Sequence, residues 1–83
     1  MKPRDYILMM LQREYSFKEG IDIDSIDYIA EGYMDSMGTL QFIVDLEAEY
    51  QIQFTDEELA SSEFRIVGKL IRLVEKKARV THG

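Results

Sequence analysis

The chain contains no cysteine and a single histidine, His82. Without cysteine it has no disulfide framework, no zinc thiolate site and no thiol nucleophile of its own. A serine hydrolase needs a base beside its nucleophile and commonly a Gly-x-Ser-x-Gly turn. No such turn occurs, and His82 falls within residues 79–83, which we expect to be disordered. These absences predict a protein that is not an enzyme.

Lysine and arginine are missing from residues 19–64, although this stretch carries thirteen Asp and Glu residues. All ten basic residues lie outside it, so the formal charge is +2 for residues 1–18, −13 for residues 19–64 and +5 for residues 65–83. A surface this negative repels nucleic-acid phosphates and anionic lipids, and it attracts proteins with Lys and Arg patches. We therefore expect protein partners with basic patches and no nucleic-acid partner.

Long hydrophobic runs are also missing. Nowhere do about 18 consecutive apolar residues occur, and the first residues lack the apolar run of a signal peptide. The apolar fraction of 46% is nevertheless ordinary for a globular protein, and 83 residues suffice for one small domain. The sequence thus predicts a single domain, residues 1–83, that is cytoplasmic and does not insert into a membrane.

Acidic residues crowd the segment around Asp22, Asp24 and Asp27, where calcium binding can be tested against a known pattern. An EF-hand requires an acidic residue or Asn at the fifth position of its loop and Gly at the sixth, but this segment has Ile26 and Asp27 there. No metal site is therefore expected. The other carboxylates are interpreted as a solvated face, and none is assigned as a general acid or base.

Helical spacing of apolar residues begins directly after Pro3, a residue that suits the first turn of a helix. The spacing predicts a first helix from about Pro3 to Tyr15. Residues 16–34 are irregular and contain Gly20 and Gly32, so they predict a long loop. A loop of this length in a small domain commonly carries function or leads to a site.

A second helix is predicted from Ser36 to about Tyr50, with Asp35 as its N-cap. At about 100° of rotation per residue, its apolar residues form two stripes. The first stripe comprises Thr39, Phe42, Ile43, Leu46 and Tyr50, and the second comprises Met37, Leu40, Val44 and Ala48. Either both stripes are buried in a small bundle, or the second faces water and is available to a partner.

Two further helices are predicted after the second. The run from Thr55 to Glu58 matches a capping box and predicts a short helix that ends near Ser61. The apolar face of a last helix comprises Ile66, Val67, Leu70, Ile71 and Val74, and either Ser61 or Ser62 can cap this helix. The predicted fold is all-α, a four-helix bundle with a long loop between the first two helices and a short third helix.

The residues around Ser36 resemble the acyl carrier protein family. The resemblance spans about Ile7 to Lys77, and its most specific part runs from Gly32 to Glu58, with Asp35-Ser36-Met37 at the start of the second helix. In that family an Asp-Ser-Leu motif opens this helix, and a phosphopantetheinyl transferase esterifies the serine with 4′-phosphopantetheine from coenzyme A. The resemblance implies that Ser36 is the attachment site, and the arm would supply the thiol that the chain lacks.

The resemblance also implies how partners are recognised. Partner enzymes of the family, which activate and transfer acyl groups, contact the second helix through acids and exposed apolar residues. The matching residues here are Asp35 and Glu47 for charge, and Met37, Leu40 and Val44 for apolar contact. This favours the exposed alternative for the second stripe, and it implies a monomer. In the same family an acyl chain can fold back between the helices.

The sequence departs from the pattern of carriers in ordinary fatty acid synthesis at Met37, Gly38 and Gln41. The run from Asp35 to Thr39, together with Gln41, is similar to D-alanyl carrier proteins. Three interpretations follow: an acyl carrier in fatty acid, polyketide or other specialised metabolism, a D-alanyl or other aminoacyl carrier, and an acidic interaction module that is never modified. The first is the interpretation that we prefer.

Overall fold

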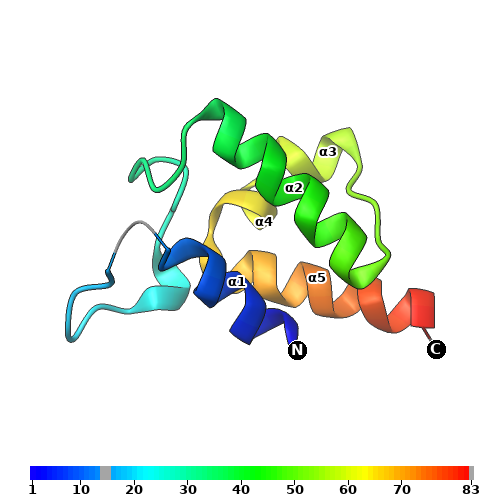
Figure 1. Cartoon of the computed structure of the whole chain (residues 1–83), viewed down its shortest axis with the longest axis horizontal. Helices are drawn as coiled ribbons and strands as arrows, with labels where there is room; N and C mark the ends of the chain where they lie inside the picture. The colour runs from blue at the N-terminus through cyan, green and yellow to red at the C-terminus, as the bar shows by residue number, and fades with distance from the viewer. Residues whose placement is uncertain (14–15, 83) are drawn as a thin grey trace.

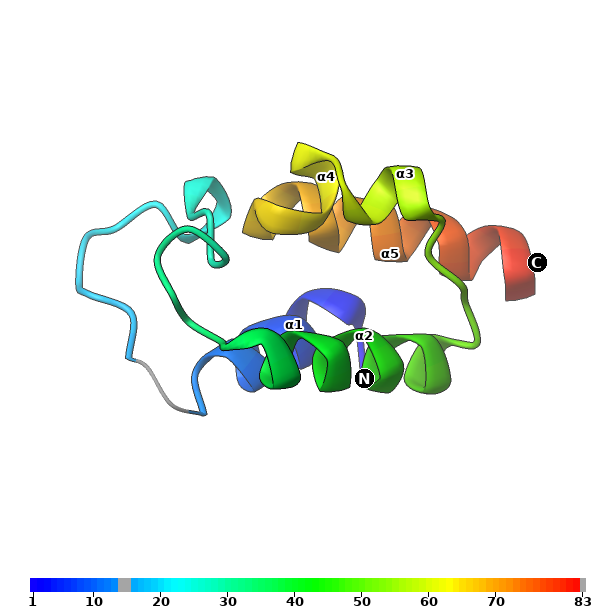
Figure 2. The same ribbon diagram turned by 90° about the horizontal axis from the view of Figure 1, so that it is seen from above.

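The computed structural model describes residues 1–13 and 16–82, and the chain is all-α over these residues (Figure 1). Its elements are α1 (Pro3–Leu11), the 3-10 turn η1 (Ile23–Ser25), α2 (Ser36–Tyr50), α3 (Asp56–Leu59), α4 (Ser62–Arg65) and α5 (Val67–His82). Figure 2 shows α1 and α2 on one side of the molecule and α3, α4 and α5 on the other. The apolar core lies between these two sides.

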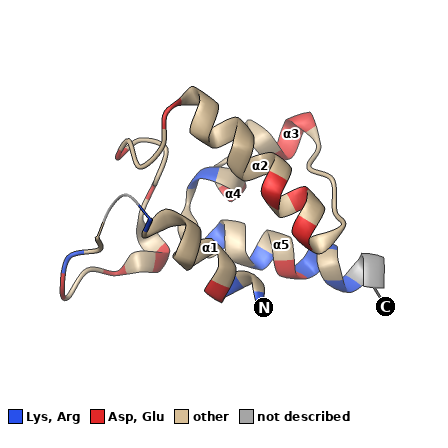
Figure 3. Cartoon of the chain, in the orientation of Figure 1, with Lys and Arg blue, Asp and Glu red and all other residues tan. Residues whose placement is uncertain are grey.

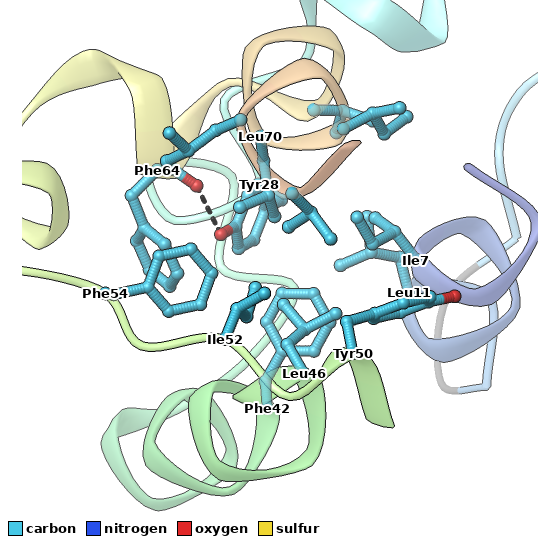
Figure 4. Packing of buried hydrophobic residues seen from close by; sticks show 14 of the residues in the cluster. Ile7, Leu11, Tyr28, Phe42, Leu46, Tyr50, Ile52, Phe54, Phe64 and Leu70 are labelled. Carbon is cyan, nitrogen blue, oxygen red and sulfur yellow. Dashed lines mark hydrogen bonds between the residues drawn. The ribbon is translucent and has the colours of Figure 1, made fainter. Parts of the chain in front are cut away.

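The core collects apolar side chains from α1, α2, α4 and α5 and from the connections between them (Figure 4). Tyr28, which follows η1, has no exposed surface, and its ring makes edge contacts with Phe42 of α2 and Phe64 of α4. The Tyr28 hydroxyl donates a hydrogen bond to the Phe64 carbonyl. A residue of the long loop therefore lies at the centre of the packing.

The first helix is shorter than the apolar spacing predicts. It ends at Leu11, and the N–H groups of Gln12 and Arg13 bond to the carbonyls of Leu8 and Met10 in a closing turn. The prediction of a helix as far as Tyr15 is therefore wrong for residues 12–13, while residues 14–15 lie outside the described part of the chain. Leu11 is the last core residue of α1 and residues 12–13 are exposed, so continuing the helix over these two residues would bury no more apolar surface.

The predicted last helix is divided into α4 and α5 by Ile66, whose backbone is extended. Asp27 and Ile66 form an isolated antiparallel bridge, in which the Tyr28 N–H bonds to the Arg65 carbonyl at 3.1 Å and the Val67 N–H to the Ile26 carbonyl at 2.9 Å. These bonds to the loop replace helical bonds at the junction. Sequence periodicity cannot show the break, because the loop partners lie about 40 residues away in the chain.

The long loop is predicted correctly, but it is tied to the helices more firmly than its sequence suggests. Asp24 pairs with Arg4 of α1 at 3.0 Å, and Asp27 pairs with Arg65 of α4 at 2.7 Å. A Cβ atom on Gly68 of α5 would lie 2.9 Å from the Asp24 Cβ atom, so glycine is needed for this close approach. Bases from outside the acidic stretch thus compensate part of its charge.

The capping box at Thr55 is confirmed. The Glu58 N–H bonds to Thr55 Oγ1 at 3.1 Å, and the Thr55 N–H bonds to Glu58 Oε1 at 2.9 Å. Of the two serines that can cap the next helix, Ser61 does so by accepting from the Glu63 N–H at 3.1 Å.

At the C-terminus, α5 continues to His82, over most of the segment, residues 79–83, for which the sequence predicts disorder. Gly83 lies outside the described residues.

Glu58 also joins α3 to α5 through an ion pair with Lys77 at 2.8 Å. Burial by itself raises the pKa of the Glu58 carboxyl, but hydrogen bonds from Lys77 and Thr55 and the Lys77 charge outweigh burial and lower the pKa below its ordinary value of 4.5. A lowered pKa means that the folded state favours the carboxylate. This contribution to the free energy of unfolding is present above the ordinary pKa and is lost as pH falls through the folded value.

We expect Glu58→Gln to lower the free energy of unfolding by about 0.5–1 kcal/mol at neutral pH. The amide oxygen can still accept from the Thr55 N–H, so the variant removes mainly the charge. Because the parent carboxyl also becomes neutral in acid, the difference should shrink as pH falls below 4.5. Urea titrations at neutral and acid pH, with Glu57→Gln on the exposed side of α3 as the control, measure it. A difference that is independent of pH would contradict this explanation.

Candidate site at the start of helix α2

The predicted start of the second helix is confirmed in detail. Asp35 has extended backbone angles, and its Oδ1 atom accepts from the Gly38 N–H at 2.7 Å. The Asp35 carbonyl accepts both the N–H and the hydroxyl of Thr39, each at 2.9 Å. A Cβ atom on Gly38 would lie 3.1 Å from Asp35 Oδ1, so the small residue makes room for the cap. Asp35 therefore sets where α2 begins, and Ser36 is its first residue.

Ser36 is exposed, and its hydroxyl has no hydrogen-bond partner among the described residues. The backbone N–H groups of Ser36 and Met37 likewise have no hydrogen-bond acceptor among the described residues, since the Asp35 side chain accepts only from the Gly38 N–H. Open N–H groups at the positive end of a helix dipole favour an anion. A phosphate ester on the Ser36 oxygen fits these donors, although the adjacent Asp35 carboxylate opposes part of the attraction.

The second apolar stripe of α2 faces water. Met37, Leu40 and Val44 are 80%, 63% and 55% exposed. The other stripe supplies Phe42, Leu46 and Tyr50 to the core. Of the two alternatives left open by the sequence, the structure thus selects the exposed stripe, and this stripe begins at the residue next to Ser36.

Glu47, predicted to provide charge for partners, has a contact inside the fold. Its Oε2 atom accepts from the Phe54 N–H at 2.9 Å and thereby holds the connection between α2 and α3. The Gln51 C-cap of α2 has a positive φ of 53°, and this left-handed residue turns the chain toward that contact. The sequence carries no signal for this use of Glu47, because Phe54 approaches it only after the turn.

The acids of α2 are concentrated in its C-terminal half, where Figure 3 shows them as red bands along the helix. They are Asp45, Glu47 and Glu49. Negative charge near the C-terminus of a helix opposes the helix dipole. These acids therefore do not stabilise α2 through its dipole, although Glu47 accepts from the Phe54 N–H and Asp45 accepts from the Gln41 amide.

A cavity of about 440 Å³ lies beside the start of α2, between α1, the long loop and α2. Asp35 and Gly38 line it together with Met10, Arg13 and Gln41. The Gln41 amide donates to the Asp45 carboxylate at 2.8 Å along its wall. Sequence reasoning missed this cavity because its residues come from three separate segments; only the Gln41–Asp45 pair, four residues apart on one helix, carries a local signal.

Within the described residues, no helix combines the length and apolar character needed to cross a bilayer.

Ser36 stands at an open helix start, between an apolar exposed stripe and a cavity. Among the described residues, no basic side chain forms an ion pair with the neighbouring Asp35. Neither a protein-family model nor a curated protein matches the sequence.

Proposed function

We propose that this protein is an acyl carrier whose Ser36 holds a 4′-phosphopantetheine arm. The observation that carries the proposal is the exposed Ser36 hydroxyl at the first position of α2, which has no hydrogen-bond partner in the described part of the chain and lies directly beside the exposed stripe of Met37, Leu40 and Val44. Attachment requires a transferase to reach the serine from solvent, and exposure permits this. The acyl carrier resemblance in the residues from Gly32 to Glu58 supports the same function.

The N-terminal end of α2 suits the attachment product. The N–H groups of Ser36 and Met37 can donate to phosphate oxygens, and the helix dipole adds about 0.3–1 kcal/mol of stabilisation for an anion there. The arm, when attached, supplies a terminal thiol that carries an acyl group as a thioester. The residues of the chain would hold the phosphate end, while the exposed stripe and the acids of α2 present the carrier to acyl-activating and acyl-transferring enzymes with basic patches.

The proposal also assigns the finer architecture. We interpret α1, α2, α3 and the α4–α5 pair as the four helices of a carrier bundle, with the long loop between α1 and α2. The carrier is proposed to be cytoplasmic and monomeric. Light scattering tests the monomer, and a stable dimer that covers the Met37 stripe would contradict the proposed use of that surface.

Intact mass before and after incubation with coenzyme A and a broad-specificity phosphopantetheinyl transferase tests the proposal. We expect a gain of one phosphopantetheine unit, located on Ser36 by peptide mapping. No gain, with the protein folded and the transferase active on another carrier, would refute the carrier and favour an unmodified interaction module. If the arm is attached, the enzyme that loads it distinguishes acyl from D-alanyl or other aminoacyl cargo.

We expect Met37→Lys to lower the kcat/KM of the transferase for this carrier about tenfold or more while leaving the helical CD signal unchanged. The lysine removes an apolar contact and places a positive charge opposite a basic patch. Met9→Lys is the matched control, since Met9 is an exposed methionine of α1 at 39% exposure. Equal losses in the two variants would show that charge alone, rather than this position on α2, governs recognition.

A further inference from the structure

A second hollow lies away from Ser36, between α3, α4 and α5, and it shares no lining residue with the cavity beside Ser36. Its volume is about 700 Å³. The floor includes Ile52 and Leu73, both buried, and Ser62 lies on its wall. Small-molecule sites commonly have volumes of about 300–1,000 Å³, so this cleft has the size of a ligand site.

The cleft is basic, whereas the chain as a whole carries a net charge of −6. Lys69, Arg72 and Lys76 line it from one side of α5, because positions separated by three and four residues share a helix face. Figure 3 shows Lys and Arg residues in blue along α5. Lys77 also lines the cleft, and two acids, Glu58 and Glu63, oppose these four bases.

The partners of these bases separate them into two groups. Lys77 is neutralised by Glu58 at 2.8 Å, and Lys69 Nζ reaches Ser62 Oγ at 3.4 Å. Arg72 and Lys76, in contrast, have no ion-pair or hydrogen-bond partner among the side chains that the structure describes, those of residues 1–13 and 16–79. A guanidinium fork and an ammonium thus remain available at the rim, one helical turn apart.

We propose that this cleft binds a small organic anion with a carboxylate or phosphate head and an apolar tail. Arg72 and Lys76 receive the head through charge-assisted hydrogen bonds, and the tail lies over Ile52 and Leu73. The hollow shape favours a small molecule over an acidic protein, because a stable protein interface buries about 800 Å² on each partner and does not need a cavity. The site does not depend on Ser36 or on its modification.

Two-dimensional ¹H–¹⁵N NMR titration of the full chain with octyl phosphate tests the proposal, and octanoate distinguishes the carboxylate source from the phosphate source. We expect saturable shifts of the Lys69, Arg72 and Leu73 amides with at least one of the two. Octyltrimethylammonium, which has the same tail and a positive head, should cause none. The absence of saturable shifts with both anions at millimolar concentration, or equal shifts with the ammonium, would overturn the proposal.

A double variant, Arg72→Gln with Lys76→Gln, should weaken binding at least tenfold, because the loss of even one charge-assisted bond is worth about a tenfold change in affinity. Lys2→Gln with Lys18→Gln removes the same charge from exposed positions that do not line the cleft. This control should bind like the parent. Equal weakening in both double variants would overturn the site, as would saturable binding of a polyglutamate peptide without binding of either octyl anion.

Discussion

Replacing Ser36 with alanine is expected to abolish attachment of the phosphopantetheine arm completely. The substitution removes the only oxygen of that side chain, so no phosphodiester can form at position 36. The fold should remain, since the Ser36 side chain is exposed and the cap of α2 comes from Asp35. Intact mass after incubation with coenzyme A and the transferase gives the result directly, and the thermal midpoint of Ser36→Ala should stay close to that of the parent.

The chain provides a matched control for this variant. Ser62 is also exposed and is also the first residue of a helix, α4, after its own capping residue. Ser62→Ala should therefore lose nothing in mass gain, although it makes the same chemical change at the same helix position. Attachment in Ser36→Ala, or its loss in Ser62→Ala, would place the modification elsewhere and refute the assignment to Ser36.

The largest expected effect on stability comes from Tyr28→Ala. Tyr28 is fully buried between Phe42 and Phe64, and truncation of a buried aromatic residue commonly costs about 3–5 kcal/mol. A domain of this size has a total free energy of unfolding of about 4–12 kcal/mol. We expect the variant to be largely unfolded or to show a greatly lowered urea midpoint, because the loop would lose its anchor in the core.

Tyr28→Phe separates the hydrogen bond from the packing. Burial raises the pKa of Tyr28 well above its usual value of 10.0, so the hydroxyl stays protonated and can donate to the Phe64 carbonyl at all ordinary pH values. Removing the hydroxyl leaves that carbonyl without its donor at a cost of about 1–3 kcal/mol.

The control for Tyr28→Ala is Phe17→Ala. Phe17 is a half-buried residue of the same loop, and its truncation should lower the free energy of unfolding less than Tyr28→Ala does. A cost below about 1 kcal/mol for Tyr28→Ala would show that the loop is not part of the core.

Much of the candidate site follows from local sequence. Asp35 caps α2 because a carboxylate one residue before a helix reaches the N–H groups of its first turn, and this depends on neighbouring residues alone. The exposure of Met37, Leu40 and Val44 follows from helical spacing once the other stripe is taken as core. The capping box at Thr55 is local for the same reason.

The features that the sequence analysis placed wrongly or did not predict depend on the folded structure and not on neighbouring residues alone. The break at Ile66 and the contact of Glu47 with Phe54 depend on groups that meet only in the folded chain, and α1 ends at Leu11, its last residue in the core. The bridge between Asp27 and Ile66 joins residues 39 positions apart. The cavity beside Asp35 and the basic cleft on α5 are likewise assembled from several segments.

The sequence by itself therefore determined the all-α class, the start of α2 with Ser36 at its first position, and the two stripes of that helix. These features arise from interactions within about one helical turn, which propensity and periodicity report. Only the tertiary structure decided where α1 stops, where α4 and α5 divide, and which bases remain unpaired. The physical reason is that long-range packing and hydrogen bonds determine them, and they link residues whose separation along the chain carries no periodic signal.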